Sequence, residues 1–294
     1  MMDFLNYVLN GVLLGEVYAL LSLGFVVIYR ASKVFNFAQG ELMLLGAYTV
    51  WTLALGFNLP PALVVPLAFA AAIGYGWLIE RVFFRRLIGE SVFSMVMVTI
   101  GLVILLRGVV LVAWGAAERQ FPALLPTTPV IVGDLLFPTN MLVGAGLTLV
   151  LTGVLWYFFN RTRFGLTLTA VAEDPYTALS AGIPVKRAVT MAWMLGGCIA
   201  TIGALVLLNG RSLSVQAADV ALAALPVALF AGLESIGGLL LAGAIVGVIQ
   251  SLVAAYVDPR LGGSASSIVP FVFMLFILLV RPTGLFGWRH IERV

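Results

Sequence analysis

Long apolar runs separated by short polar breaks make up most of this 294-residue chain. Most runs approach the roughly 20 residues that an α-helix needs to span the hydrocarbon core of a bilayer. We therefore predict an all-α polytopic membrane protein with one transmembrane domain over residues 1–294. The predicted spans are residues 5–29, 38–55, 61–80, 91–114, 140–160, 188–209, 217–232, 237–257 and 267–280. Because the seventh is short, we expect about nine crossings, with eight as the alternative if it only enters the membrane.

Basic residues at the ends of these runs predict which ends face inside, because positive charge collects on the cytoplasmic side of a membrane. If the N-terminus starts outside and the spans alternate, twelve of the sixteen basic residues fall inside, namely Arg30, Lys33, Arg81, Arg85, Arg86, Arg161, Arg163, Lys186, Arg187, Arg281, Arg289 and Arg293. Three fall outside, Arg119, Arg211 and Arg260, and Arg107 lies within a span. Residues 115–139, which contain four prolines, then form the longest external loop.

The polar break from residue 161 to residue 187 carries the clearest local signals. Asp174 can cap the start of a short helix, and Pro175 suits its first position. Gly182, followed by Pro184, suits its end. The pattern predicts a helix of about two turns on the inner side.

One face of this short helix is apolar. Tyr176, Leu179 and Ile183 share it at helical spacing. An exposed apolar face on a short capped helix, in a chain otherwise made of membrane spans, indicates a docking site for another protein. A helix that merely rests on lipid headgroups is the alternative.

The composition excludes several classes of protein. Hydrophobic residues make up 62% of the chain and charged residues only 10%, which is too apolar for a soluble domain. The basic residues form no stripe, so we expect no nucleic-acid partner. The first run lacks a basic segment before it and is longer than a signal peptide, so we expect it to remain a span.

The same composition argues against catalysis and bound cofactors. One cysteine, Cys198, and one histidine, His290, cannot supply a disulfide framework and argue against a metal site. Neither lysine lies in a GxxxxGK[ST] phosphate-binding loop, and no Ser/His/Asp set is present. We predict a non-enzymatic chain that binds no metal or cofactor and does not bind ATP through such a loop.

Polar residues within the predicted spans are the other candidates for function. A charge in hydrocarbon needs a partner, a watery cavity or a neutral state. Glu16 is the deepest and is expected to face a cavity; the alternative is a protonated carboxyl, or one paired with Arg107, that fixes helix packing. Glu41 and Glu234 lie nearer span ends, so we expect them to snorkel to water.

Two breaks, at residues 30–40 and 232–238, are polar or rich in glycine. Non-helical backbone at membrane depth is tolerated where it lines a cavity or is buried in protein. These breaks indicate where a solute could pass, although tight helical hairpins would look the same. Together with the polar span residues they give a candidate translocation pathway of Glu16, Tyr18, Asn36, Gln39, Glu41 and Glu234.

Small residues recur every fourth position in three of the runs. Such stripes let helix backbones approach closely in lipid, so they predict faces that pack against other helices. The stripes are Gly11, Gly15 and Ala19; Gly196, Ala200 and Ala204; and Gly243, Gly247, Ser251 and Ala255.

Several separated motifs, in order along the chain, resemble one known family. The first resembles the opening signature of the integral membrane permeases of branched-chain amino-acid ABC importers, and consists here of Gly15, Tyr18, Ala19 and Leu20, then Asn36, Phe37, Ala38 and Gly40, then Gly46, Ala47 and Tyr48. Residues 170–187 resemble that family's cytoplasmic loop, which engages the ATPase subunits. The glycine-rich residues 232–247 and the closing residues 281–287 also match.

The resemblance implies roles for residues of the inner segment. It makes Glu173, Asp174, Pro175, Ala178 and Gly182 ATPase-coupling residues, to which the apolar face adds Tyr176 and Leu179. It implies two ATPase subunits that hydrolyse ATP with Mg, a second permease subunit that is identical or related, and an external solute-binding protein.

The function that the resemblance implies is half of a transport pathway in the bacterial cytoplasmic (inner) membrane. Branched-chain or other hydrophobic amino acids are the first expectation for the solute, and urea, amides or small organic acids are the second. A proton-coupled secondary transporter, driven through Glu16, is the alternative from another class.

Overall fold

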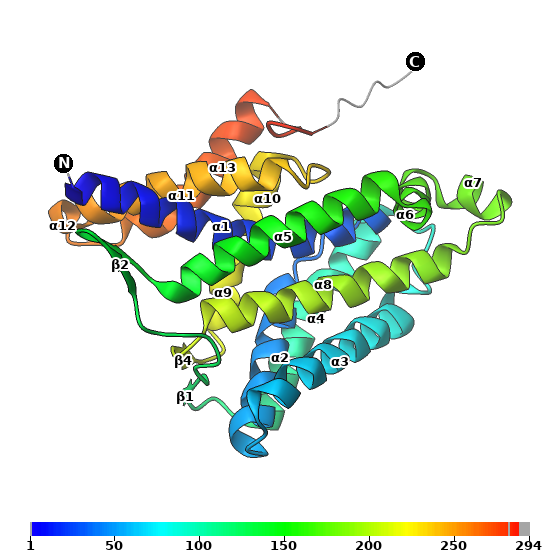
Figure 1. Ribbon diagram of the computed structural model, residues 1–294. Coiled ribbons are helices and arrows are strands. Elements are labelled where there is room, and N and C mark those ends of the chain that lie inside the picture. Colours follow the sequence, from blue (N-terminus) through cyan, green and yellow to red (C-terminus); the bar gives the residue numbers. More distant parts are fainter. Residues whose placement is uncertain (1, 282, 288–294) are drawn as a thin grey trace.

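The computed structural model describes residues 2–281 and 283–287 of a bundle of helices (Figure 1). Within the described residues, six helices are long and apolar enough to cross a membrane. They are α1 (Met2–Ser32), α3 (Pro61–Ile79), α4 (Val92–Trp114), α5 (Thr139–Arg161), α8 (Val185–Leu207) and α11 (Gly238–Tyr256).

Shorter helices complete the remaining predicted spans. The second is α2 (Gln39–Trp51), which continues as a π-helical turn over Thr52–Gly56, as α3 does over Glu80–Phe84. The seventh is broken into α9 (Ala217–Leu222) and α10 (Leu225–Ala231). The last is α13 (Val269–Val280), preceded by the short α12 (Asp258–Leu261) and a 3₁₀ turn at Ala265–Ile268. Every predicted run therefore contains helix.

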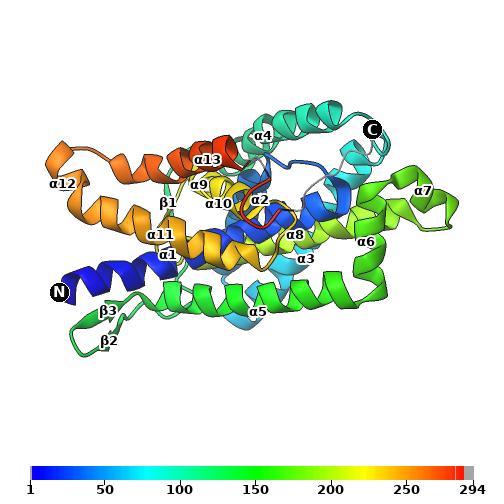
Figure 2. The same cartoon turned by 90° about the horizontal axis from the view of Figure 1, so that it is seen from above.

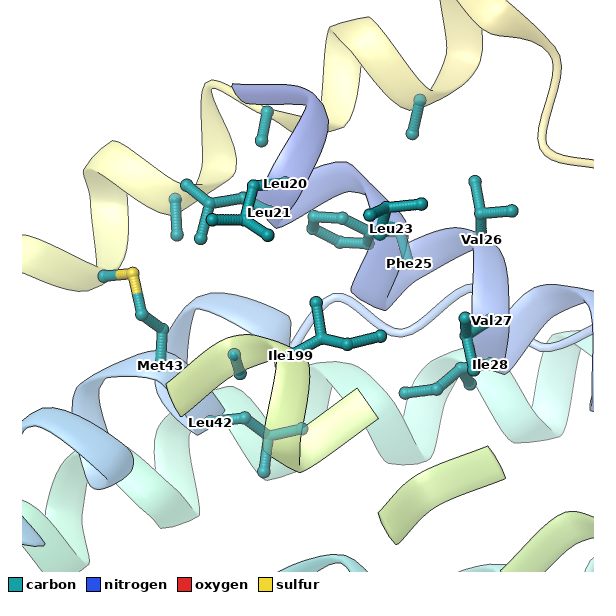
Figure 3. Packing of buried hydrophobic residues seen from close by; sticks show 14 of the residues in the cluster. Leu20, Leu21, Leu23, Phe25, Val26, Val27, Ile28, Leu42, Met43 and Ile199 are labelled. Atoms are coloured by element: carbon teal, nitrogen blue, oxygen red, sulfur yellow. The ribbon is translucent and has the colours of Figure 1, made fainter. Parts of the chain in front are cut away.

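Helix α1 lies at the centre of the bundle. Of its most apolar stretch, 83% is buried, compared with 22% for α4 at the periphery. It packs against α11, α8 and α5, and the apolar core between them includes Leu21 and Phe25 of α1, Met43 of α2 and Ile199 of α8 (Figure 3). Because other helices pack against α1 on several sides, its apolar residues are not confined to one face.

The stripes of small residues lie where helices touch. A Cβ atom added to Gly15 would lie 2.0 Å from the carbonyl oxygen of Gly243, and one added to Gly247 would lie 2.2 Å from that of Gly11. A Cβ added to Gly196 would lie 2.6 Å from Cδ1 of Ile28. The predicted close packing is confirmed, and it joins α1 to α11 and α8.

The break between α1 and α2 turns back into the bundle. The chain turns at Lys33, whose φ is +52°, and α2 begins at Gln39 beside the middle of α8. Gln39 Nε2 donates to the carbonyl oxygen of Gly196 over 3.2 Å. Helix α2 therefore starts inside the protein and not at its end.

The α9–α10 segment connects opposite ends of the bundle. Just before it, β4 (Ser212–Leu213) pairs antiparallel with β1 (Arg119–Gln120) in the 115–139 loop. Just after it, Glu234 pairs with Lys33, close to the end of α1. The segment thus passes through the molecule between α2 and α13 (Figure 2).

The basic residues also separate between the two ends. Arg30, Arg85 and Arg161 lie at the end that carries α7 (Pro175–Ser180), at the right of Figure 1. Arg119, Arg211 and Arg260 lie with the short strands and α12 at the other end. Arg289, Arg293 and His290 lie outside the described residues. Which end faces the cytoplasm stays a prediction.

Two features differ from the expected all-helical pattern. The 115–139 loop contains a hairpin of β2 (Val130–Val132) and β3 (Leu135–Phe137) besides β1, because its prolines exclude helix but allow short extended segments. The inner segment contains an unpredicted helix, α6 (Arg163–Glu173). Thr162 caps α6, and Leu168 and Val171 bury its apolar face against the bundle.

Candidate functional site

The short helix α7 forms as the sequence predicts. The side chain of Asp174 accepts hydrogen bonds from the backbone N–H groups of Tyr176, at 2.9 Å, and Thr177, at 3.1 Å. A further hydrogen bond from the Thr177 hydroxyl is the largest of the effects that lower the pKa of Asp174, ahead of the backbone bonds. A capping carboxylate that accepts several hydrogen bonds stays ionised and fixes the start of the helix.

The end of α7 is fixed by backbone geometry. Gly182 has a φ of +79°, and its N–H donates to the carbonyl of Leu179 while Ile183 N–H donates to that of Ala178. This pair of bonds is the Schellman arrangement, which favours glycine because a side chain is strained at positive φ. The chain therefore leaves α7 in one defined direction toward α8.

The outer face of α7 is open. Tyr176 is 67% exposed and Leu179 is 63% exposed, whereas Ala178 is buried. A groove beside this face is lined by Arg85, Lys186 and Arg187. The surface therefore combines two apolar side chains with a basic rim.

A second polar group joins the segment of residues 161–187 to both of the predicted breaks. Lys33 Nζ lies 2.8 Å from Glu173 Oε1 at the end of α6, and it also pairs with Glu234 between α10 and α11. Burial lowers the pKa of Lys33, but its hydrogen bonds to Glu173 and Glu234 outweigh burial and raise it. The ammonium group therefore stays charged and holds two carboxylates together.

This group lines a cavity of about 610 Å³ at the α7 end of the bundle. The walls come from the end of α1, α6, the start of α4 and the glycine-rich turn after α10, and include Tyr29, Val92 and Gly232. Of the predicted pathway residues, Glu234 lines this cavity, together with Glu173, which the sequence suggested only for coupling. Glu234 is about a quarter exposed and paired, so snorkelling alone does not describe it.

A third polar group lies within the spans, and here the sequence expectation was wrong. Arg107 Nε donates to Glu41 Oε1 over 2.9 Å, and Arg107 Nη2 donates to Asp219 Oδ1 over 2.7 Å. Glu41 is not near water, since its side chain is only 3% exposed. It begins a helix inside the bundle, where snorkelling is impossible. Nothing in the local sequence around Asp219 indicates this contact.

Glu16 does not meet Arg107. It is 7% exposed, and its Oε2 atom is buried without a hydrogen-bond partner among the described residues. Tyr18, on the same helix, is also buried. Neither lines a cavity described above, so the structure offers no direct support for a pathway role of either residue.

Asn36 and Gln39 stabilise the turn between α1 and α2. Asn36 Nδ2 donates to Gln39 Oε1 over 3.2 Å, and Asn36 Oδ1 accepts from Ala38 N–H over 3.1 Å. Both side chains are 1% exposed. In this conformation they stabilise backbone that would otherwise lie unpaired at membrane depth. Over the described ranges, no group of three or more His, Cys, Asp or Glu residues could hold a metal ion.

Comparison with known proteins decides the family. A family model described as the permease component of the branched-chain amino acid transport system matches residues 7–278. This chain belongs to that family. It is therefore a multi-pass membrane permease and a transport component, not an enzyme.

Relatives of this permease match it from end to end. It is 29% identical to the high-affinity branched-chain amino acid transport system permease protein BraD of Pseudomonas aeruginosa, over 99% of this chain and 98% of that protein. It is 27% identical to the corresponding LivH of Escherichia coli strain K12, with the same coverage. Among solved structures, PsaBC from Streptococcus pneumoniae in complex with Fab has a TM-score of 0.50 at 15% identity, covering 96% of this chain and 97% of that one. That similarity concerns the fold alone.

Proposed function

We propose that this permease forms half of the translocation pathway of an ATP-driven importer of branched-chain amino acids. The full-length match to the family carries this proposal, because the relatives are named as permeases of high-affinity branched-chain amino acid transport. A second permease subunit, identical or related, supplies the other half. Two ATPase subunits supply the energy, and an external binding protein delivers the solute.

The ATPase contact is assigned to α7. Its exposed Tyr176 and Leu179 give an apolar anchor, and Arg85, Lys186 and Arg187 give a charged rim. A buried apolar anchor surrounded by a polar rim is the usual organisation of a protein interface. Glu173, Asp174, Pro175, Ala178 and Gly182 act by holding this face in place.

Transmission from α7 to the spans runs through Lys33 in this proposal. Glu173 ends α6 directly before α7, and Lys33 joins it to Glu234 at the turn between α10 and α11. A displacement of α7 would therefore reach the cavity at this end of the bundle through charged contacts.

The test is transport in vesicles that contain this permease with its cognate ATPases, second permease and binding protein. Uptake of labelled leucine, isoleucine and valine should require enclosed ATP. Uptake driven by a pH gradient alone would overturn the proposal in favour of proton coupling. Uptake of urea, amides or organic acids in place of the amino acids would overturn the proposed substrate class.

The docking face is tested by the double variant Tyr176→Ala with Leu179→Ala. We expect ATP-driven uptake to fall at least about tenfold and the ATPases to be lost on purification, because interface anchors carry most of the binding energy. The matched control is Ser180→Ala, whose hydroxyl bonds only within α7 to the carbonyl of Tyr176. Full uptake by the double variant would remove α7 from the ATPase interface.

A further inference from the structure

The ion cluster of Glu41, Arg107 and Asp219 joins three helices inside the bundle. Glu41 is near the start of α2, Arg107 is in α4 and Asp219 is in α9. At 1.5 Å per residue, Arg107 lies about 10 Å along α4 from its end at Trp114 and about 22 Å from Val92. The cluster therefore lies within the depth of the hydrocarbon core and not at its edge.

Direct contact of this ion cluster with lipid would be energetically unfavourable. Glu41 is enclosed, but the side chain of Arg107 is 35% exposed and that of Asp219 is 55% exposed. The same helix α4 presents strongly apolar side chains, with Ile104 74% and Val112 90% exposed. Charges that are exposed at this depth are stable only if water or another protein covers them. Water in a path between two permease subunits would provide that cover.

The cluster contains more acidic groups than basic ones. One guanidinium faces two carboxylates, so the cluster carries one excess negative charge when all three groups are ionised. Arg107 contacts Glu41 through both Nε and Nη2, at 2.9 and 2.7 Å. Asp219 is the outer member, and within the described part of the chain its Oδ2 atom accepts no hydrogen bond. Glu41 Oε2 also has no partner among the described residues, but it is buried, so a solute can reach the excess charge only through Asp219.

We propose that Asp219 is a binding group for the ammonium of an amino acid that passes through the pathway, with Arg107 and Glu41 as positioning residues. Arg107 holds Asp219 Oδ1 and leaves Oδ2 free to accept from the ammonium. Buried Glu41 fixes the guanidinium in turn. A primary ammonium supplies the missing positive charge, whereas a neutral amide, urea or a carboxylic acid does not. This inference rests on the proposed function and names the chemical feature of the solute that the pathway selects.

The test uses a thiol next to the site. Val220 follows Asp219 and is 44% exposed, so Val220→Cys in a Cys198→Ala background leaves the cluster intact. In the reconstituted complex, a water-soluble thiosulfonate should modify the introduced thiol. Leucine should slow this modification at least about fivefold, whereas 4-methylpentanoate, which has the same side chain but no amine, should not. No modification, or equal protection by both compounds, would overturn the proposal.

The second measurement removes the charge from the binding group. Asp219→Asn should abolish protection by leucine and lower ATP-driven leucine uptake at least about tenfold, while Asp219→Glu should restore part of both. Arg107→Gln should raise the leucine concentration needed for protection but leave the thiol reactive. Asp134→Asn, an exposed aspartate in the 115–139 loop, is the matched control and should change neither. Unchanged uptake by Asp219→Asn would make the cluster purely structural.

The two proposals fail differently in these experiments. If the unmodified complex takes up no amino acid with ATP, the proposed function fails whatever the variants do. If it takes up leucine normally and Asp219→Asn does so equally well, only the ammonium site fails. Should Asp219→Asn not assemble, the comparison of leucine with 4-methylpentanoate at position 220 still decides the matter in an intact cluster.

Discussion

Gly182 shows how much of the candidate interface depends on one backbone conformation. It is the residue at which the chain leaves α7, and nothing lies within 4 Å of the place where its Cβ would be. The positive φ, and not a lack of space, therefore limits which residues this position can hold. A side chain in the left-handed region costs about 1–2 kcal/mol, less for asparagine and more for β-branched residues.

We expect Gly182→Val to lower ATP-driven uptake strongly and Gly182→Asn to retain most of it, because asparagine tolerates the left-handed conformation. Hydrogen exchange at the Ile183 amide, which is bonded to Ala178 in the native turn, reports the conformation directly. Faster exchange in the valine variant alone is the expected pattern. Equal exchange and uptake in both variants would show that the turn does not orient α7.

At the scale of helices, the contact between α1 and α11 is made by backbone against backbone. We expect Gly15→Ala to destabilise the protein by about 1–3 kcal/mol. The added methyl group would lie only 2.0 Å from the carbonyl oxygen of Gly243, so the site would be overpacked. Gly101→Ala in α4 is the control, since nothing lies within 4 Å of that position. Thermal unfolding in detergent should separate the two variants; similar midpoints would contradict the packing.

The Lys33 group joins α1, α6 and the turn after α10, and its removal should affect coupling more than stability. The side chains of this group are between 22% and 53% exposed, and an ion pair that reaches solvent contributes only about 0.2–1 kcal/mol, so Glu173→Gln and Glu234→Gln should each leave the unfolding midpoint nearly unchanged. Lys33→Met should be the most harmful, because it leaves two carboxylates close together. ATP hydrolysis that no longer drives uptake is the expected readout, and uptake unaffected by all three changes would argue against transmission here.

The helices could be predicted from the sequence, because an apolar run of about 20 residues has few alternatives to a membrane span. The caps of α7 were equally visible, since Asp174, Pro175 and Gly182 act within a few residues of one another. Helix α6 was missed because it is short and amphipathic and follows a span directly. The partners of Arg107 could not be predicted, because Glu41 lies 66 and Asp219 lies 112 residues away, and no local pattern indicates such contacts.

At the scale of the whole molecule, the two ends of the bundle give a test of orientation. In a Cys198→Ala background, Ile131→Cys in the β2–β3 hairpin and Leu261→Cys in α12 should react with a membrane-impermeant maleimide in intact cells. Leu179→Cys in α7 should react only after permeabilisation. All three parent side chains are more than 60% exposed in this chain, so in cells that lack the partner subunits access is limited by the membrane alone. Protection of the Leu261 position in intact cells would favour eight crossings.

The central place of α1 has a consequence for how the protein is made. This helix leaves the ribosome first, yet α11, which covers its glycine-lined side, is synthesised more than 200 residues later. In the interval Gly11 and Gly15 lie without their final neighbour, and Glu16 lies in surroundings that are not yet complete. A nascent chain halted before Gly238 therefore keeps its innermost surface uncovered, which makes such fragments natural targets for membrane quality control.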